Sequence, residues 1–112
     1  KLVIGCDEAA YRLKEAMKET IIQLGHEVKD VGVCIRTVRK AVRMITDGSC
    51  ERGILLCGTG IGMAITANKI PGIRAAVGHD LFSVERSIKS NDCQVLCMGA
   101  RVIAAKYARL LV

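Results

Sequence analysis

The sequence has few aromatic residues and no segment long enough to cross a membrane. Aromatics make up 3% of the 112 residues, tryptophan is absent and proline occurs once. No apolar run approaches the roughly 20 residues of a membrane-spanning helix, and no signal peptide begins the chain. We therefore expect a cytoplasmic protein without a membrane partner, folded as a single domain over residues 1–112.

The composition also limits the kind of core and the state of the cysteines. Hydrophobic residues make up 51% of the chain, and with so few aromatics the core must be aliphatic, which is typical of a parallel sheet covered by helices. The six cysteines include no CxxC pair of the metal-binding type. Four of them lie within or at the ends of apolar strand patterns, which favours reduced thiols over a disulfide framework.

The net charge of +6 is partly concentrated on one predicted helix face. The face carries basic residues at spacings of 0, 3, 4 and 7, namely Arg36, Arg39, Lys40 and Arg43. The opposite face carries apolar residues that would pack on a sheet, namely Ile35, Val38, Val42 and Ile45. A basic stripe can bind nucleic acid, but no aromatic residue is interleaved with it. We predict a solvated face and no nucleic-acid partner, while the positive field would also attract a sugar phosphate.

The most informative segment runs from Gly53 to Met63 and reads GILLCGTGIGM. It is typical of a buried parallel strand that ends in a glycine-rich turn and continues as a helix. The first amides of such a helix have no internal partner, so the turn forms a cradle for an anion. Cys57 stands at the carboxyl end of the strand, where open α/β sheets bind ligands. A thiol beside amide donors suits chemistry that passes through an oxyanion.

Strand and helix patterns alternate along the whole chain. Strands are predicted at 2–6, 26–31, 54–57, 73–77 and 94–98, and helices at 9–24, 34–46, 63–69, 80–89 and 102–112. In the first helix the inward positions are Leu13, Met17, Ile21 and Leu24. Asp80 is placed to cap the fourth helix. Five strand–helix units predict an α/β fold, a three-layer αβα sandwich with a Rossmann-like five-stranded parallel sheet.

Several segments together resemble the ribose-5-phosphate isomerase B family, which includes the paired subunits of galactose-6-phosphate isomerase. The matching segments are IGCD at 4–7, LKE at 13–15, GHEV at 25–28, the turn at 53–63, ANKIPGIRA at 67–75, Asn91-Asp92, and MGARVI at 98–103. They occur in order over nearly the whole chain, so the resemblance does not depend on a glycine motif alone.

This resemblance implies an aldose–ketose isomerase that converts a phosphorylated sugar through a cis-enediolate, with no metal and no organic cofactor. It implies that Cys57 is the base and that Thr59 moves protons between the sugar oxygens. The backbone of the turn would hold the developing oxyanion, and the substrate-binding positions are Asp7, Glu8, Gly58, Gly60, Ile61, Gly62 and Asn91. It further implies a homodimer or tetramer whose active sites are shared between subunits.

Two positions depart from the family pattern. Glu8 stands where most members have a histidine that binds substrate oxygens or phosphate, and a carboxylate there repels phosphate unless it faces hydroxyls or is protonated. Ser90 stands at the position of the histidine that opens the sugar ring, and serine does not titrate near neutrality. Either the ring opens spontaneously or the substrate has no ring, as in a tetrose 4-phosphate, whose O4 is esterified.

Two family segments have no match. A longer loop containing Asp-Tyr-Pro is expected between Gly32 and Cys34, and a tail with phosphate-binding arginines is expected after Val112. Arg101 and Arg109 do not match those arginines. Segments missing from the given sequence would account for both gaps, and we expect the central loop and C-terminal tail to lie outside it.

Several functions stay open at this stage. The primary expectation is conversion of ribose 5-phosphate to ribulose 5-phosphate, with tetrose 4-phosphate, allose 6-phosphate or galactose 6-phosphate as alternative substrates. A non-catalytic sugar-phosphate sensor would use the same cradle. A dinucleotide oxidoreductase is disfavoured, because the glycine spacing is not GxGxxG and the turn follows the third strand rather than the first.

Overall fold

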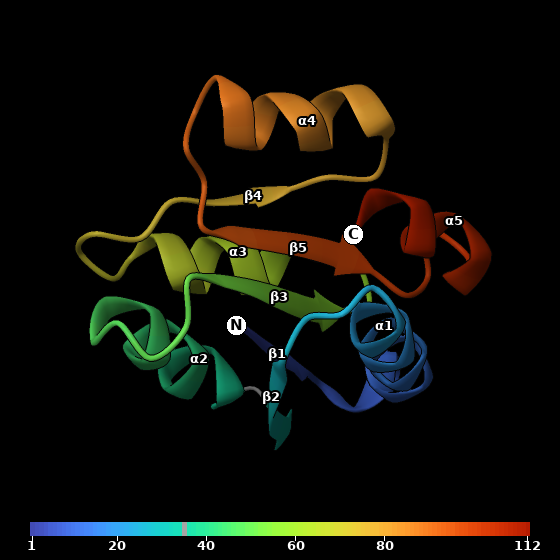
Figure 1. Cartoon of the computed structure of the whole chain (residues 1–112), viewed down its shortest axis with the longest axis horizontal. Coiled ribbons are helices and arrows are strands. Elements are labelled where there is room, and N and C mark those ends of the chain that lie inside the picture. The colour runs from blue at the N-terminus through green and yellow to red at the C-terminus, as the bar shows by residue number, and fades with distance from the viewer. Residues whose placement is uncertain (35) are drawn as a thin grey trace.

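The computed structural model describes residues 1–34 and 36–112 and shows a parallel sheet between two layers of helices (Figure 1). The elements in chain order are β1 (Leu2–Cys6), the 3-10 turn η1 (Glu8–Ala10), α1 (Tyr11–Gln23), β2 (Val28–Val33), α2 (Thr37–Thr46), β3 (Arg52–Cys57), α3 (Ile61–Asn68), β4 (Ala75–Val77), α4 (Leu81–Lys89), β5 (Val95–Gly99) and α5 (Ala105–Leu111).

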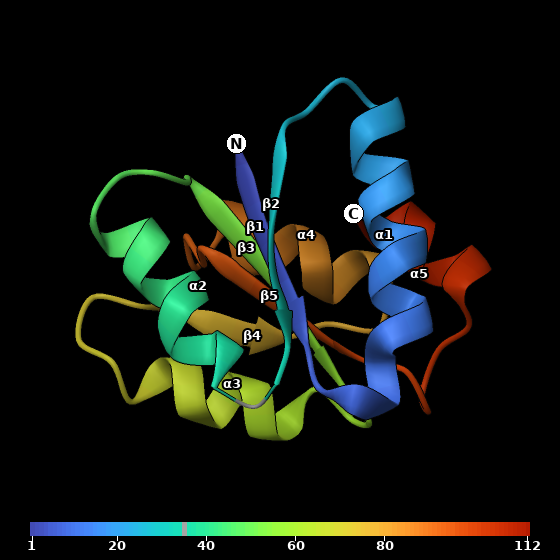
Figure 2. The same ribbon diagram turned by 90° about the horizontal axis from the view of Figure 1, so that it is seen from below.

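The strand order is β2-β1-β3-β5-β4, and each neighbouring pair is parallel. Helices α2 and α3 pack on one face of the sheet, whereas α1, α4 and α5 pack on the other, as seen from below in Figure 2. The predicted three-layer αβα sandwich with five parallel strands is therefore confirmed.

The core is aliphatic and divided by the sheet into two halves. Successive side chains of a strand point to opposite faces, so Leu55 belongs to the core under α2 and α3, while Ile54 and Leu56 belong to the core under α1, α4 and α5. All three are at most 3% exposed. Because β3 is buried on both faces, its sequence is a continuous apolar run rather than an alternating one.

Two details of the first and last helices differ from the prediction. Leu24 is 59% exposed rather than buried, because α1 ends at Gln23 and Leu24 is its C-cap. The last helix begins at Ala105 and not at residue 102. Residues 100–103 instead form a turn, in which the amides of Val102 and Ile103 both donate to the carbonyl of Gly99.

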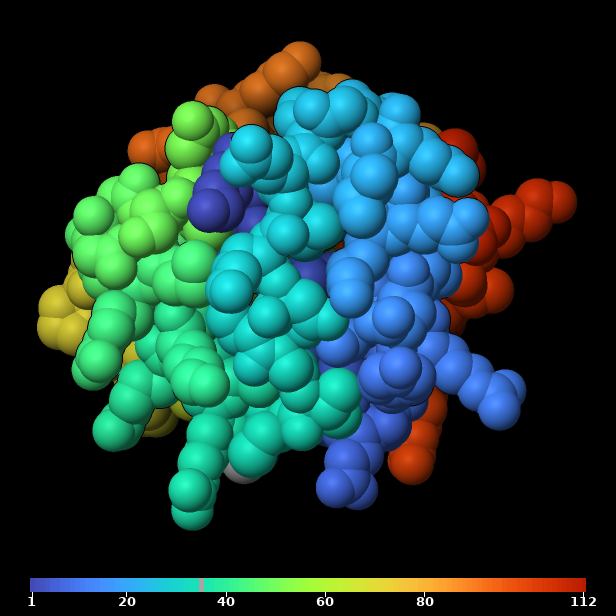
Figure 3. All heavy atoms as spheres, turned by 60° about the horizontal axis from the view of Figure 1, so that its bottom comes forward, coloured from blue at the N-terminus to red at the C-terminus, as the bar shows by residue number. Residues whose placement is uncertain are grey.

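Helix α2 also starts later than predicted, at Thr37, and Ile35 of the predicted apolar face lies outside the described residues. Val38 and Val42 are each 1% exposed, as the helical spacing predicts. The basic residues of the other face are exposed, and with β2 they line a groove of about 880 Å³ on the side of the molecule shown in Figure 3.

A buried ion pair joins α1 to β2. The side chain of Lys14 is 3% exposed, and its ammonium donates to both carboxylate oxygens of Asp30, at 2.9 and 2.7 Å. Lys18 and the amide of Gly32 donate to the same carboxylate. Burial alone would raise the pKa of Asp30, but these hydrogen bonds outweigh it and lower the pKa from 3.8 to about 2.

Removing this carboxylate is expected to destabilise the fold. Asp30→Asn leaves the buried Lys14 ammonium without its anion, and we expect a loss of about 3 kcal/mol in the free energy of unfolding at pH 7. Because the folded-state pKa is depressed, the stabilisation is present above about pH 4 and lost as the pH falls toward 2. Urea unfolding of both proteins across that range checks this, with Asp47→Asn as the exposed control; a difference that does not shrink with falling pH would contradict it.

None of the helices in the described part of the chain is long and apolar enough to span a membrane.

Candidate active site

At the ends of the neighbouring strands β1 and β3, the chain continues to opposite faces of the sheet. β1 and β3 are neighbours, with Cys6 opposite Leu56, but α1 follows β1 onto one face and α3 follows β3 onto the other. Diverging connections of this kind open a crevice at the carboxyl ends of the strands, which is the usual ligand site of a doubly wound sheet. The amide of Asp7 donates to the carbonyl of Leu56 at 3.0 Å and fixes Asp7 at this point.

Cys57 is the last residue of β3, and its side chain is half-buried at this crevice. Its Sγ accepts a hydrogen bond from the amide of Gly60 at 3.0 Å. Gly60 is the N-cap of α3 and has a left-handed backbone with φ of 83°. This hydrogen bond fixes the sulfur at the N-terminus of α3.

Thr59 stands beside this thiol on the same turn. Its Oγ1 accepts a hydrogen bond from the amide of Ile61 at 3.2 Å, while the side chain itself is exposed. With the oxygen oriented by the helix amide, the hydroxyl proton is available to a ligand. Two of the amides predicted to hold an oxyanion, those of Gly60 and Ile61, therefore already donate to Cys57 and Thr59.

The turn is seated directly on the end of β5. A Cβ added to Gly99 would lie 2.6 Å from the backbone of Thr59 and 2.7 Å from the carbonyl oxygen of Gly58. A Cβ on Gly60 would lie 3.0 Å from the backbone of Met98. Only glycine fits at these two positions, so the close approach of two backbones fixes where the thiol and the hydroxyl lie.

Sequence reasoning missed two side chains that belong to this region. The Arg101 side chain passes over the turn, with its Cδ 3.7 Å and its Nε 3.8 Å from where a Gly58 Cβ would stand. The Nε2 of His79 accepts a hydrogen bond at 2.8 Å from the amide of Gly99, the residue on which the turn packs. Arg101 lies inside the matched segment 98–103, but only its contact with the turn shows its place.

The two acidic positions after β1 have different surroundings. The Oδ1 atom of Asp7 is buried and has no hydrogen-bond partner within the described residues. An unpaired buried carboxylate oxygen is costly, and a ligand hydroxyl would satisfy it. Glu8 is exposed at the start of η1.

The structure does not bring Ser90 and Asn91 to this crevice within one chain. They precede Val95, the first residue of β5, and Val95 pairs with Gly53, four residues before Cys57. At about 3.3 Å per residue, the start of β5 lies roughly 13 Å from Cys57 along the strands, and Ser90 and Asn91 precede that start. The Oγ of Ser90 accepts a hydrogen bond from Arg86 at 3.3 Å, and Asn91 is exposed.

Three of the other thiols are poor candidates for a base. All six cysteines are free, and burial raises the pKa of Cys6 to about 11 and that of Cys97 to about 12. Burial also raises the pKa of Cys93.

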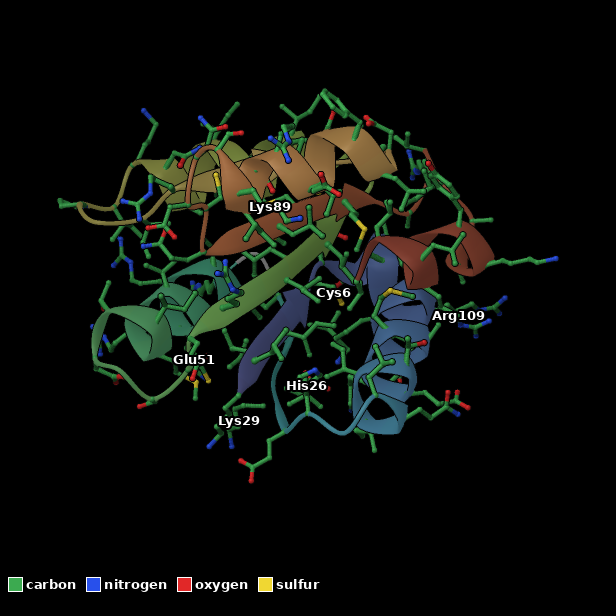
Figure 4. All side chains as sticks on the ribbon, turned by 45° about the horizontal axis from the view of Figure 1, so that its top comes forward. Cys6, His26, Lys29, Glu51, Lys89 and Arg109 are labelled. Atoms are coloured by element: carbon green, nitrogen blue, oxygen red, sulfur yellow. The ribbon has the colours of Figure 1, made fainter. Side chains whose placement is uncertain are left out.

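Figure 4 shows Cys6 at the carboxyl end of β1 beside α1, whereas His26 and Lys29 lie at the opposite end of the strands, and Arg109 extends from α5 into solvent.

The described residues contain no group of three or more His, Cys, Asp or Glu side chains arranged to hold a metal ion.

A doubly wound sheet with a thiol, a hydroxyl and a glycine turn at its switch point is an α/β fold with a ligand site at that point. Comparison with known proteins assigns it to the aldose–ketose isomerases. A protein-family model described as Ribose/Galactose Isomerase matches residues 2–112, and the chain belongs to this family.

Curated relatives and solved structures agree with this assignment. The chain is 43% identical over 122 residues to "D-erythrulose-4-phosphate isomerase 2" of Mycolicibacterium smegmatis, covering 100% of this chain and 80% of the relative. It is 45% identical over 115 residues to "Ribose-5-P isomerase B" of Listeria innocua, covering 96% and 78%. The ribose-5-phosphate isomerase B structure from Clostridium thermocellum superposes with a TM-score of 0.94 at 36% identity, covering 98% and 79%.

Proposed function

We propose that Cys57 is the base of the isomerisation and that the turn after β3 stabilises the enediolate. The observation that carries the proposal is the 3.0 Å hydrogen bond from the Gly60 amide to the Cys57 Sγ, which fixes the half-buried sulfur at the N-terminus of α3 beside the crevice. The thiolate removes the proton from the carbon next to the carbonyl and returns it to the neighbouring carbon. Neither step needs a metal, because the charge moves onto oxygens that face amides.

The neighbouring side chains supply the remaining proton transfers and contacts. The Thr59 hydroxyl, whose oxygen is fixed by the Ile61 amide, passes a proton between O1 and O2 of the sugar. The unpaired Oδ1 of Asp7 accepts a hydrogen bond from a sugar hydroxyl. The amides of Gly58 and Gly62 complete the contacts to the substrate oxygens, and Glu8 contacts hydroxyls rather than phosphate.

Arg101 is proposed as a cation for the phosphate or the developing oxyanion. Its guanidinium reaches over Gly58 and is fixed at its backbone, where the Arg101 amide donates to the Gly58 carbonyl at 3.0 Å. Arginine presents several donors in a planar fork that suits phosphate oxygens. The sequence match gave Arg101 no such role, so this assignment rests on its position alone.

We propose a tetrose 4-phosphate as the preferred substrate. Among the described residues the two histidines are His26, at the far end of the strands, and His79, whose Nε2 is engaged by Gly99. The turn that bears Asn91 carries Ser90, which cannot act as the acid or base of ring opening. Erythrose 4-phosphate has no free O4 and stays acyclic, so it needs no such group. Two relatives named D-erythrulose-4-phosphate isomerase, 43% and 42% identical, support this choice.

Ribose 5-phosphate is the second candidate, supported by the Listeria innocua relative at 45% identity. On this alternative the furanose opens spontaneously, and turnover is limited by the small open-chain fraction of the substrate. A sugar-phosphate sensor is the third reading. The presence of both Cys57 and Thr59 in hydrogen-bonded positions argues against loss of catalysis.

A panel of sugar phosphates decides among these substrates. We expect kcat/KM for erythrose 4-phosphate to exceed that for ribose 5-phosphate by at least about tenfold. Tenfold is a lower bound, because loss of one general acid–base group usually lowers the rate by more than that. Allose 6-phosphate and galactose 6-phosphate complete the panel. Equal or faster turnover of ribose 5-phosphate would rule out the tetrose preference, and tight binding without turnover would favour a sensor.

We further propose that a second copy of the chain completes each site. Ser90 and Asn91 lie at the end of the sheet away from Cys57, so a neighbouring chain must present them if they contact the substrate. Ile61 and Ile65 lie one turn apart on α3, beside Thr59, and each is 54% exposed. Apolar surface next to a site is suited to burial in an interface, and closed two-fold dimers are the commonest arrangement.

A further inference from the structure

The turn between α4 and β5 holds a strained residue next to Asn91. Asp92 has φ of +50°, and it is the only non-glycine residue with positive φ in the described part of the chain. A left-handed backbone is unfavourable for a residue with a Cβ, although Asp tolerates it better than most. Such a conformation persists where surrounding contacts impose it, and it then fixes the direction of the neighbouring side chain.

The backbone of this turn is tied to the last turn of α4. The amides of Ser90 and Asn91 donate to the Arg86 carbonyl, that of Asp92 to Ile88, and that of Cys93 to Ser87. Four consecutive amides are therefore used within the turn. The Asn91 side chain stays exposed and is left free to meet a ligand or another chain.

Arg74 secures the turn from the side of β4. Its Nε donates to the Asp92 carbonyl at 2.9 Å and its Nη2 donates to the Asp92 carboxylate at 3.1 Å. The backbone of Arg74 is itself fixed, because its amide donates to Oε1 of Gln94 at 2.8 Å and its carbonyl accepts from the Gln94 amide at 3.0 Å. A single guanidinium thus holds both the carbonyl and the side chain of the strained residue.

Stability alone does not explain this arrangement. Arg74 and Asp92 have side chains that are 50% and 80% exposed, and ion pairs this open to water contribute little to folding. The pair instead determines geometry, because the bidentate contact admits one orientation of the turn. Asn91, the neighbour of Asp92 in this turn, is the residue that the proposed chemistry uses.

We infer that Arg74 is a positioning residue, which holds Asp92 in its left-handed conformation. The neighbouring Asn91 is thereby presented to the sugar hydroxyls in the active site that contains Cys57 of a second chain. This inference rests on the proposed function, in which Asn91 binds substrate. Arg74 touches no substrate in this account and acts only through the turn. Substrate binding then depends on the guanidinium of Arg74, which lies outside the catalytic turn after β3.

The test is a double-mutant cycle between Arg74 and Asn91, measured with the best substrate of the panel. We expect Arg74→Gln and Asn91→Ala each to raise KM by about tenfold while kcat changes by less than about threefold. The double variant should be no worse than Asn91→Ala, because both changes remove the same contact. Arg74→Lys keeps the charge but loses the bidentate geometry, and it should fall between Arg74→Gln and the wild type.

Controls separate positioning from folding. Arg43→Gln removes the same charge from the exposed face of α2 and should leave KM and kcat unchanged. Asp92→Asn keeps a side chain that tolerates the left-handed backbone and an oxygen that still accepts from Arg74, so its KM should fall between those of the wild type and Arg74→Gln, without loss of thermal stability. Wild-type kinetics in Arg74→Gln, or additive effects in the double variant, would overturn the inference.

The kinetics of Asn91→Ala distinguish failure of the positioning role of Arg74 from failure of the proposed substrate contact of Asn91. If Asn91→Ala lowers substrate affinity while the cycle is additive, the proposed function stands and the role of Arg74 fails. If Asn91→Ala has wild-type kinetics while turnover still depends on Cys57, Asn91 is not a substrate contact, and the inference about Arg74 fails with it.

Discussion

Replacement of Cys57 by serine is expected to lower kcat by about 10²–10⁴-fold, the usual contribution of a positioned general base. Serine is nearly the same size, and its Oγ can still accept the Gly60 amide that now donates to Sγ at 3.0 Å. The turn and the fold should therefore remain intact. What is lost is an ionisable group, because a serine hydroxyl does not become an anion near neutrality without a neighbouring base.

The kinetic constants distinguish a lost base from a damaged site. We expect KM to stay within a few-fold of the wild type, because the contacts to substrate hydroxyls come from Asp7 and the amides and not from the thiol. Cys34→Ser, at an exposed thiol that is not part of the turn, is the matched control and should retain full activity. A Cys57→Ser enzyme with more than about a tenth of the wild-type kcat would show that another group is the base.

A second readout follows the proton directly. In heavy water, the wild-type enzyme should release product that carries deuterium at the carbon where the proton is exchanged with the thiol. The Cys57→Ser variant should show the same large loss in this exchange as in turnover, because both need the same proton abstraction. Exchange that survives in the variant would place proton abstraction on a different residue.

The elements of the fold were predictable because strand and helix signals alternate without conflict. The run from Gly53 to Cys57 is apolar on both faces, as a central parallel strand must be, and Asp80 caps α4 by accepting the Ser83 amide at 2.7 Å as predicted. The start of α5 was not predictable from periodicity. It depends on tertiary contacts of the preceding turn, in which the amides of Ala100 and Arg101 donate to the carbonyls of Cys57 and Gly58.

The site was only partly predictable for a related reason. Local sequence places Cys57 and Thr59 on one turn, since both follow the same strand within three residues. Whether Asn91 is near them depends on strand order, because β5 lies beside β3 although α3, β4 and α4 intervene in sequence. The contact of Arg101 with Gly58 also arises from this pairing, since Gly99 stands opposite Cys57. The parallel register therefore brings Arg101 to the turn that follows Cys57 and places Asn91 at the other end of the sheet.

That separation gives a prediction with a large effect, the recovery of activity when two impaired chains are mixed at a substrate concentration below KM. If each site uses Cys57 of one chain and Asn91 of another, a Cys57→Ser chain and an Asn91→Ala chain complement each other. After co-refolding, half of the dimers are mixed, and each mixed dimer has one site with both native residues. We expect about a quarter of the wild-type activity at a substrate concentration below KM, from parents that are both strongly impaired.

The controls make this result specific for a shared site. A mixture of Cys57→Ser with Cys57→Ala has no dimer with a native thiol and should stay inactive. Each parent refolded alone measures the background, and separate affinity tags on the two chains allow the mixed dimer to be isolated and assayed by itself. If each chain instead uses its own Asn91, every site contains one altered residue, and mixing can give no more than the mean of the two parents. The start of β5, which Asn91 precedes, lies roughly 13 Å from Cys57 along the strands, and this distance makes the second outcome the unexpected one.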